Sequence, residues 1–144
     1  MKRRILIVDD ERDFTHLARV TLESLGNFKV IEENDATAAL ATARREEPEL
    51  ILLDIMMPQI DGGELAALLA NDARLQHIPV IFLSALVTQE ETCEGGSYSA
   101  GGRIYFPKPV NWTSLVQRME QCLSQGRQAV VVEYACNPHS ADRR

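Results

Sequence analysis

The chain has 144 residues, 45% of them hydrophobic and 25% charged, which is the composition of an ordinary globular domain. Its formal net charge of -6 at pH 7 argues against a general nucleic-acid binder, because neutralising backbone phosphates takes clustered lysine and arginine. No segment approaches the roughly 20 apolar residues of a membrane span, and the apolar run before Asp9 is too short for a signal-peptide core. We therefore expect a cytoplasmic protein that binds neither nucleic acid nor membrane.

Five short apolar segments alternate with segments of helical periodicity along the chain. This alternation is typical of βαβ units, in which helices join parallel strands. The third and fourth segments are apolar without interruption, as expected of strands that are buried on both faces of a sheet. The predicted strands cover residues 4–8, 28–32, 50–53, 79–83 and 103–106.

The segments that follow these strands carry apolar side chains at helical spacing. The first predicted helix ends near Gly26 and the last at Gly126. The second begins at a cap formed by Asn34 or Asp35 and ends before Pro48. The faces expected to pack on the sheet are Phe14, Leu17, Ala18, Leu22 and Leu25 in the first helix, Ala39, Leu40 and Ala43 in the second, Leu65, Leu68 and Leu69 in the third, and Trp112, Leu115, Val116, Met119, Cys122 and Leu123 in the last.

The segment between the fourth and fifth strands is the least regular part of the predicted fold. Residues 88–94 favour only a short or irregular helix, and residues 95–102 hold half of the eight glycines of the chain. Glycine loses the most backbone freedom when it is ordered. We therefore expect residues 94–102 to form a mobile loop or to follow a non-helical path.

The pattern predicts a single domain over residues 1–126. The remaining residues, 127–144, are too few for a second domain. They contain a β-prone run at residues 129–134, which is compatible with an added strand, with a truncated linker or with a frayed end.

Polar side chains follow four of the five predicted strands. Asp9 and Asp10 come after the first strand, Asp54 after the third, Ser84 after the fourth, and Lys108 shortly after the fifth. In an open parallel sheet, ligands bind beyond the carboxyl ends of the strands. We therefore expect these side chains to lie together at one edge of the sheet.

The chemistry of this group indicates phosphoryl transfer. Three neighbouring carboxylates repel one another, and a hard divalent cation with oxygen ligands, Mg²⁺, resolves that conflict. Lys108 supplies a positive charge for a phosphoryl oxygen, and the Ser84 hydroxyl can donate a hydrogen bond to another. A carboxylate that attacks phosphorus forms an acyl phosphate, and we expect Asp54 to be that acceptor.

Five short motifs, taken in order, resemble the receiver domains of bacterial two-component response regulators. They are Ile5-Leu6-Ile7-Val8-Asp9-Asp10-Glu11, Leu52-Leu53-Asp54-Ile55-Met56-Met57-Pro58, Asp61-Gly62, Leu83-Ser84-Ala85 and Tyr105-Phe106-Pro107-Lys108-Pro109. The resemblance covers about residues 3–125. It implies a doubly wound α/β fold with a five-stranded parallel sheet in the order 2-1-3-4-5 and helices on both faces.

The resemblance also implies a role for each site residue. Asp54 is the phosphoacceptor. Mg²⁺ is bound directly by Asp10, by Asp54 and by the backbone carbonyl of Met56, and through water by Asp9. Ser84 and Lys108 contact the phosphoryl group, and Ser84 with Tyr105 forms a conformational switch. The Lys108–Pro109 peptide bond resembles one that is cis in this family.

The implied protein is a phosphoacceptor rather than an enzyme, and assists only its own phosphorylation and dephosphorylation. The resemblance implies a histidine kinase or phosphotransfer protein as its partner, and it allows a homodimer. No effector segment follows the last helix, so the sequence names no output, stimulus or cognate kinase.

The same residues allow four other interpretations. Asp9 and Asp10 could serve merely as caps of the first helix, but capping does not explain the presence of Asp54 as well. Tyr105 is as readily a packing residue as a switch. An unphosphorylated scaffold remains an alternative function, because residues 94–102 depart from the family pattern. A nucleotide- or flavin-binding protein is disfavoured, because it would need a glycine-rich turn where this chain has Asp9, Asp10 and Glu11.

Overall fold

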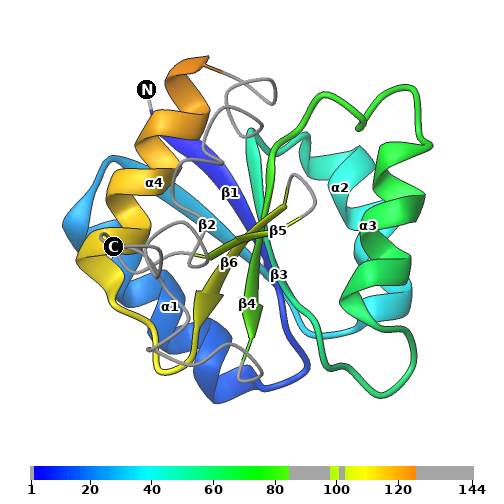
Figure 1. Ribbon diagram of the computed structural model, residues 1–144, viewed down its shortest axis with the longest axis horizontal. Helices are drawn as coiled ribbons and strands as arrows, with labels where there is room; N and C mark the ends of the chain where they lie inside the picture. Colours follow the sequence, from blue (N-terminus) through cyan, green and yellow to red (C-terminus); the bar gives the residue numbers. More distant parts are fainter. Residues whose placement is uncertain (1, 85–97, 101–102, 126–144) are drawn as a thin grey trace, which may run out of the picture.

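A β-sheet forms the centre of the computed structural model, which describes residues 2–84, 98–100 and 103–125 (Figure 1). The strands are β1 (Arg3–Val8), β2 (Phe28–Glu33), β3 (Leu50–Asp54), β4 (Val80–Ser84), β5 (Tyr98–Ala100) and β6 (Arg103–Pro107). The helices are α1 (Arg12–Leu25), a 3-10 turn (Ala36–Ala38), α2 (Ala39–Glu46), α3 (Gly62–Ala70) and α4 (Trp112–Gln125). Among these described helices, none is both long and apolar enough to cross a bilayer.

The sheet has the strand order β2-β1-β3-β4-β6-β5. The first five strands in this order are parallel, which confirms the predicted five-stranded sheet and its order. β1 and β3 lie next to each other in the middle, so the chain leaves β1 toward one side of the sheet and later returns to build the other. This reversal places a crevice beyond the carboxyl ends of β1 and β3.

The sheet has one more strand than the sequence predicted. β5 pairs with β6 in antiparallel register, with Tyr98 opposite Tyr105. The expected mobile loop is therefore wrong for Tyr98–Ala100, although the path there is indeed not helical. A neighbouring strand with unpaired backbone groups can order even a glycine-flanked segment. The predicted short helix at residues 88–94, the stop at Gly126 and the run at residues 129–134 lie outside the described residues.

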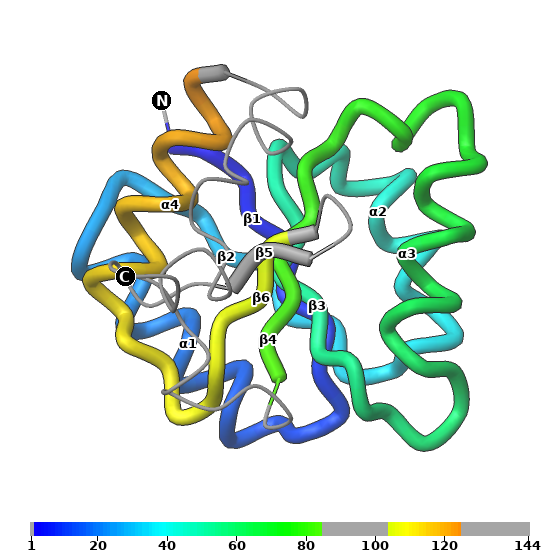
Figure 2. The backbone as a smooth tube through the Cα atoms, in the orientation of Figure 1, coloured from blue at the N-terminus to red at the C-terminus, as the bar shows by residue number. Residues whose placement is uncertain are grey.

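Two apolar layers enclose the sheet, one on each face. Figure 2 shows α1 beside α4 on one face and α2 beside α3 on the other, and these helix pairs are in contact. Alternate residues of each strand serve opposite layers. On β1, for example, Ile5 and Ile7 are buried beneath α1 and α4, whereas Leu6 and Val8 are buried beneath α2 and α3.

The apolar faces of two helices are narrower than the sequence predicted. Leu17 and Leu25 of α1 are 53% and 47% exposed, and Leu68 of α3 is 46% exposed. The buried positions of α1 are the predicted Ala18 and Leu22, together with Thr15, which was not predicted. Thr15 is polar but can be buried because its hydroxyl donates to the Arg12 carbonyl of the same helix and to the Glu32 carboxylate on β2.

The start of α3 packs against the backbone at the end of β3. Asp61 caps α3 by accepting a hydrogen bond from the Glu64 amide at 2.8 Å. The Gly62 amide donates to the Ile55 carbonyl, also at 2.8 Å. A Cβ atom on Gly62 would lie 2.5 Å from the Asp54 carbonyl oxygen, so only glycine fits this close approach. The Asp61-Gly62 motif thus fixes the peptide that carries Asp54.

We predict that Gly62→Ala lowers the free energy of unfolding by about 1–3 kcal/mol, because the Asp54–Ile55 backbone must shift to admit the methyl group. Urea denaturation measures this change. Gly63→Ala is the matched control in the same helical turn, and it should leave stability unchanged or raise it by up to about 1 kcal/mol. Equal effects of the two substitutions would contradict a special role for Gly62.

Candidate functional site

The carboxyl ends of the parallel strands bring the predicted site residues together. Asp54 is the last residue of β3, Asp9 follows β1, and Lys108 follows β6. Asp9, Asp10 and Asp54 each contribute one carboxylate oxygen to a cluster in which the three oxygens lie within 4.8 Å of one another. This is the convergence that the strand pattern predicted.

Lys108 lies between two of these carboxylates. Its Nζ is 2.7 Å from Asp9 Oδ2 and 3.3 Å from Asp54 Oδ1. Its backbone amide donates to the Ser84 carbonyl at 3.0 Å, which ties the loop after β6 to the end of β4. The Lys108–Pro109 peptide bond is cis, as predicted from the resemblance.

Three further hydrogen bonds to the backbone and side chain of Asp9 hold this residue in place. Its amide donates to the Glu33 carbonyl at 3.1 Å, and its Oδ1 accepts from the Glu11 amide at 3.0 Å. Asn34 Nδ2 donates to the Asp9 carbonyl at 2.8 Å and to Thr15 Oγ1 at 2.9 Å. The sequence predicted Asn34 only as an alternative helix cap. Asp35 caps the 3-10 turn that precedes α2, and Asn34 anchors Asp9.

The site has the charge and the ligand chemistry of a magnesium centre. Asp9 and Asp54 are 1% and 6% exposed, while Asp10 faces solvent at the rim. Three carboxylates and one ammonium leave two negative charges unbalanced, which is the charge that a divalent cation neutralises. Carboxylate oxygens are the ligands that Mg²⁺ prefers, so the residues present fit this ion.

These neighbours shift the ionisation of both central groups. Burial first, and then the negative charge of Asp9, raise the pKa of Asp54 to about 6, although Lys108 and the Met56 amide act in the opposite direction. Burial acts to lower the pKa of the Lys108 ammonium, but its bonds to Asp9 and Asp54 outweigh that effect and hold the pKa above its ordinary value. The ionised pair is therefore maintained at neutral pH.

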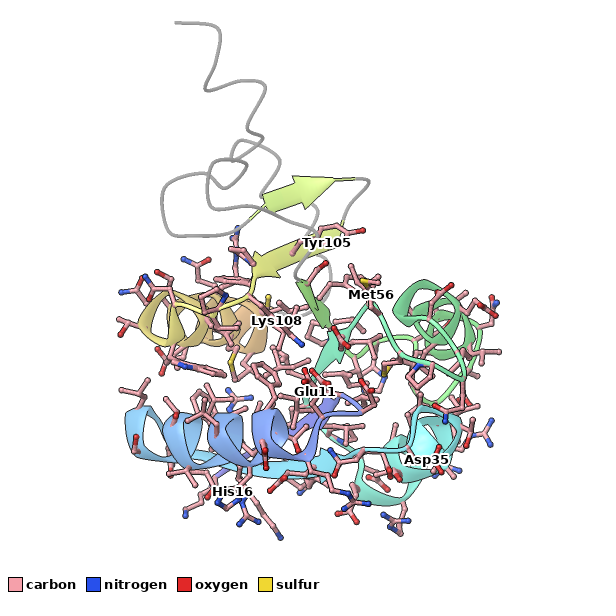
Figure 3. The ribbon with its side chains drawn as sticks, turned by 90° about the horizontal axis from the view of Figure 1, so that it is seen from below. Glu11, His16, Asp35, Met56, Tyr105 and Lys108 are labelled. Carbon is pink, nitrogen blue, oxygen red and sulfur yellow. The ribbon has the colours of Figure 1, made fainter. Side chains whose placement is uncertain are left out.

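The remaining predicted site residues lie around this centre. Ser84 is fully buried at the end of β4, one position beyond Leu83, which is the register partner of Asp54. Met56 donates its backbone amide to the Asp54 carboxylate, while its side chain is 60% exposed. Tyr105 stacks on Phe82 with ring centroids 5.1 Å apart. Figure 3 shows the Tyr105 side chain directed away from Lys108.

An aromatic residue at this site was missed as a functional residue. The Lys108 ammonium lies over the ring of Phe14, with Nζ 4.3 Å from the ring centroid. The Trp112 ring is 5.9 Å from that of Phe14 and is tilted by 31° to it. The helical periodicity assigned both residues to the core. It gave no sign that Phe14 also faces a charged group, because Lys108 is far away in the sequence.

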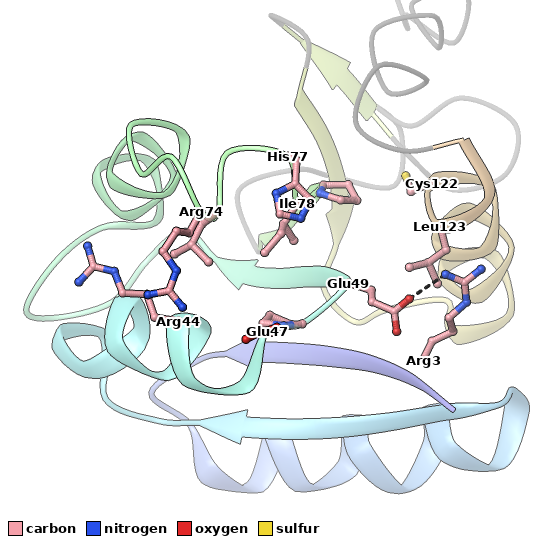
Figure 4. A pocket seen from close by; sticks show the side chains of 12 residues that line it. Arg3, Arg44, Glu47, Glu49, Arg74, His77, Ile78, Cys122 and Leu123 are labelled. Carbon is pink, nitrogen blue, oxygen red and sulfur yellow. Dashed lines mark hydrogen bonds and ion pairs between the residues drawn. The ribbon is translucent and has the colours of Figure 1, made fainter. Parts of the chain in front are cut away.

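A cavity of about 540 Å³ lies at the opposite end of the sheet (Figure 4). It is lined there by residues around the amino ends of β1, β3 and β4, including the Arg3–Glu49 ion pair at 2.8 Å. None of the described residues that line it belongs to the predicted site. The acidic cluster is thus separate from this cavity.

The raised pKa of Asp54 predicts that ionisation of this carboxyl group lowers the free energy of unfolding. The folded chain keeps a proton up to about pH 6, whereas an unfolded aspartate, with a pKa of 3.8, has already lost it. The stability that this group contributes is therefore present below about pH 4 and lost as the pH rises to about 6. Without Mg²⁺, Asp54→Asn should raise the free energy of unfolding at pH 7 by about 1 kcal/mol, allowing for solvent screening, and by little at pH 4.

Asp72→Asn is the control with the opposite sign. A hydrogen bond from Arg44 holds the pKa of Asp72 below its ordinary value. This carboxylate stabilises the fold above the unfolded pKa, and its contribution is lost as the pH falls, so the substitution should destabilise the protein at pH 7. Denaturation of both variants at pH 7 measures the two signs, and a change of the same sign in both variants would contradict the assignment.

The comparisons with known proteins identify the family of this chain. The model of the response regulator receiver domain family matches residues 5–120. PilH of Pseudomonas aeruginosa is 32% identical over 121 residues, which are 84% of this chain and 98% of PilH. Rre1, a response regulator of Synechocystis, is 37% identical over 107 residues, which are 74% of this chain. The chain spans 19% of RcaC of Microchaete diplosiphon, 46% of Rre1 and 48% of RpaA of Synechocystis.

Solved structures agree as well. The receiver domain of the hybrid histidine kinase CckA has 30% identity and a TM-score of 0.65, and the match covers 83% of this chain and 98% of that one. The chemotaxis response regulator CheY4 of Vibrio cholerae has a TM-score of 0.68 over 84% of this chain and 98% of that one, and at 23% identity it supports the fold alone. Because the family match runs from β1 into α4, this chain belongs to the response-regulator receiver domains of two-component signalling.

Proposed function

We propose that Asp54 accepts a phosphoryl group in a Mg²⁺-dependent reaction and that the chain acts as a conformational switch. The observation that supports this is the placement of the Asp54 carboxylate between the Lys108 ammonium at 3.3 Å and the carboxylates of Asp9 and Asp10. The receiver unit spans residues 1–126, and residues 127–144 are a tail or a truncated linker. The chain is a phosphoacceptor that assists only its own phosphorylation and dephosphorylation, not an enzyme acting on other substrates.

The transfer is a displacement at phosphorus. A lone pair of an ionised Asp54 oxygen forms the new O–P bond as the bond from phosphorus to the donor group breaks and its electron pair leaves with the donor. The pKa of about 6 leaves most of the Asp54 carboxyl groups ionised at neutral pH, even without a cation. Backbone contacts around Asp9, and the fit of Gly62 against the Asp54 peptide, keep the acceptor in place.

The Mg²⁺ ion would be held by Asp9, Asp10, Asp54 and the Met56 carbonyl, and it would neutralise charge that develops on the phosphoryl oxygens. The Lys108 ammonium neutralises another of these oxygens. The Ser84 hydroxyl, buried at the end of β4, donates to a third after transfer. Tyr105 then moves with Ser84, because both lie on neighbouring strands, β4 and β6.

The donor in the cell is a histidine kinase or a phosphotransfer protein, since receiver domains interact with proteins of these classes. The reaction takes place in the cytoplasm, without direct contact with nucleic acid or membrane. The output passes to an effector through the protein surface, and a homodimer is compatible with it.

We expect the chain to gain one phosphoryl group when it is incubated with acetyl phosphate and Mg²⁺, as measured by intact mass. Asp54→Asn and the addition of EDTA should each abolish the adduct. Asp72→Asn, which removes a carboxylate at the other end of the molecule, should leave it intact. If wild-type protein takes up no phosphoryl group and binds no beryllofluoride, the switch is refuted and a scaffold role is favoured.

Lys108→Gln should lower the rate of phosphorylation about a hundredfold, because a preorganised charge at the phosphoryl oxygens is lost. The same variant should bind Mg²⁺ at least as tightly as wild type, since the ammonium no longer competes for Asp9 and Asp54. Stopped-flow kinetics and calorimetry measure the two quantities. A parallel loss of rate and Mg²⁺ affinity would indicate general damage to the site instead.

A further inference from the structure

The Lys108 ammonium has three neighbours among the described residues. Two are the carboxylates of Asp9 and Asp54, at 2.7 and 3.3 Å. The third is the face of the Phe14 ring, whose centroid is 4.3 Å from Nζ. An ammonium within about 6 Å of a ring centroid is attracted by the negative face of the aromatic ring. The Lys108 side chain is only 17% exposed, so water weakens this attraction little.

The Phe14 ring is itself held in place. It comes from the first turn of α1, just after Asp9 and Asp10, and packs with Trp112 of α4 against the core. The Trp112 ring packs beside it, with centroids 5.9 Å apart. Phe14 therefore presents a fixed surface to Lys108, whereas the lysine side chain has four rotatable carbon bonds and needs contacts to define its position.

The carboxylate contacts of Lys108 are the ones that the proposed reaction disturbs. A divalent cation bound to Asp9 and Asp54 takes up their oxygen atoms and repels the ammonium, and transfer of a phosphoryl group converts the Asp54 carboxylate into an acyl phosphate. The ring face of Phe14 is a contact that uses no carboxylate oxygen. It is the contact of Lys108 that metal binding and phosphorylation leave available.

We infer that Phe14 is a positioning residue: its ring face keeps the Lys108 ammonium at the site once Asp9 and Asp54 are engaged. This inference rests on the proposed phosphoryl transfer to Asp54. A leucine or methionine at position 14 would fill the same space between α1 and α4 but would offer no negative ring face. The distinction between packing and positioning is therefore electrostatic, and it can be tested without changing the size of the side chain.

The experiment replaces Phe14 in the full chain by phenylalanines that carry one, two or three ring fluorine atoms, introduced at this position alone. Fluorine withdraws electron density from the ring face while the shape stays almost the same. We expect the rate of phosphorylation by acetyl phosphate to fall stepwise, by about three- to tenfold at the last step. The affinity for Mg²⁺, measured by calorimetry, should not weaken, because the ring holds the ammonium and not the cation.

Phe28 is the matched control, because it is a buried phenylalanine of the same core and no cation lies over its ring in the described residues. The same series at Phe28 should leave the rate unchanged. A flat series at Phe14, or equal effects at the two positions, would overturn the positioning role. So would a fall in Mg²⁺ affinity that parallels the fall in rate.

A second readout needs neither metal nor phosphorylation. In the metal-free protein the methylene protons next to the Lys108 ammonium lie near the ring face, so their NMR signals should appear upfield of those of Lys2 and Lys29, the other lysines of the chain. Phe14→Leu should remove this displacement, and its absence in wild type would overturn the ring contact itself. A wild-type chain that shows the displacement but accepts no phosphoryl group would refute the proposed function, and with it the positioning role, while the contact stands.

Discussion

The structure depends on the collection of like charges at the end of a buried sheet. Asp9 and Asp54 are almost completely enclosed, and Asp10 lies beside them at the rim. Burial and repulsion both oppose this arrangement, as the raised pKa of Asp54 records. A domain of this size has only a small margin of stability. The arrangement therefore persists only because other groups fix the carboxylates and the Lys108 ammonium offsets part of their charge.

The groups that hold the carboxylates in place are mostly backbone atoms, and several of them come from elements that are distant in the sequence. Asp9 is held by the amide of Glu11, by the carbonyl of Glu33 on β2, and by the side chain of Asn34. Asp54 is held through its own peptide, against which Gly62 packs without room for a side chain. Backbone groups move little once the sheet and helices are packed. The carboxylates are thus the rigid half of the site.

The sequence allowed the strands and the converging side chains to be predicted because both are local patterns. Uninterrupted apolar runs mark buried strands, and the residue that follows each run lies at a known edge of the sheet. Contacts between distant segments carry no such mark. Nothing in the sequence pairs Asn34 with Asp9 or Phe14 with Lys108, and the short strand β5 forms only because β6 offers it an unpaired edge. Leu17 was misplaced because helical spacing fixes a face but not how much of it the neighbours cover.

Lys108 is the long, flexible side chain of the site. Its surroundings explain how it can stay there in both charge states proposed for Asp54. Before the reaction, the ammonium neutralises carboxylates whose charge the fold cannot otherwise support. In the proposed phosphorylated state those oxygens are engaged by the cation and the phosphoryl group, whereas the contact with the Phe14 ring uses no carboxylate oxygen and is retained. Because the ring belongs to α1 and is braced by Trp112 of α4, the position of the ammonium is coupled to the packing of these two helices. In the proposed switch, a change of charge at Asp54 would therefore reach α1 and α4 through Lys108, as well as β4 through Ser84.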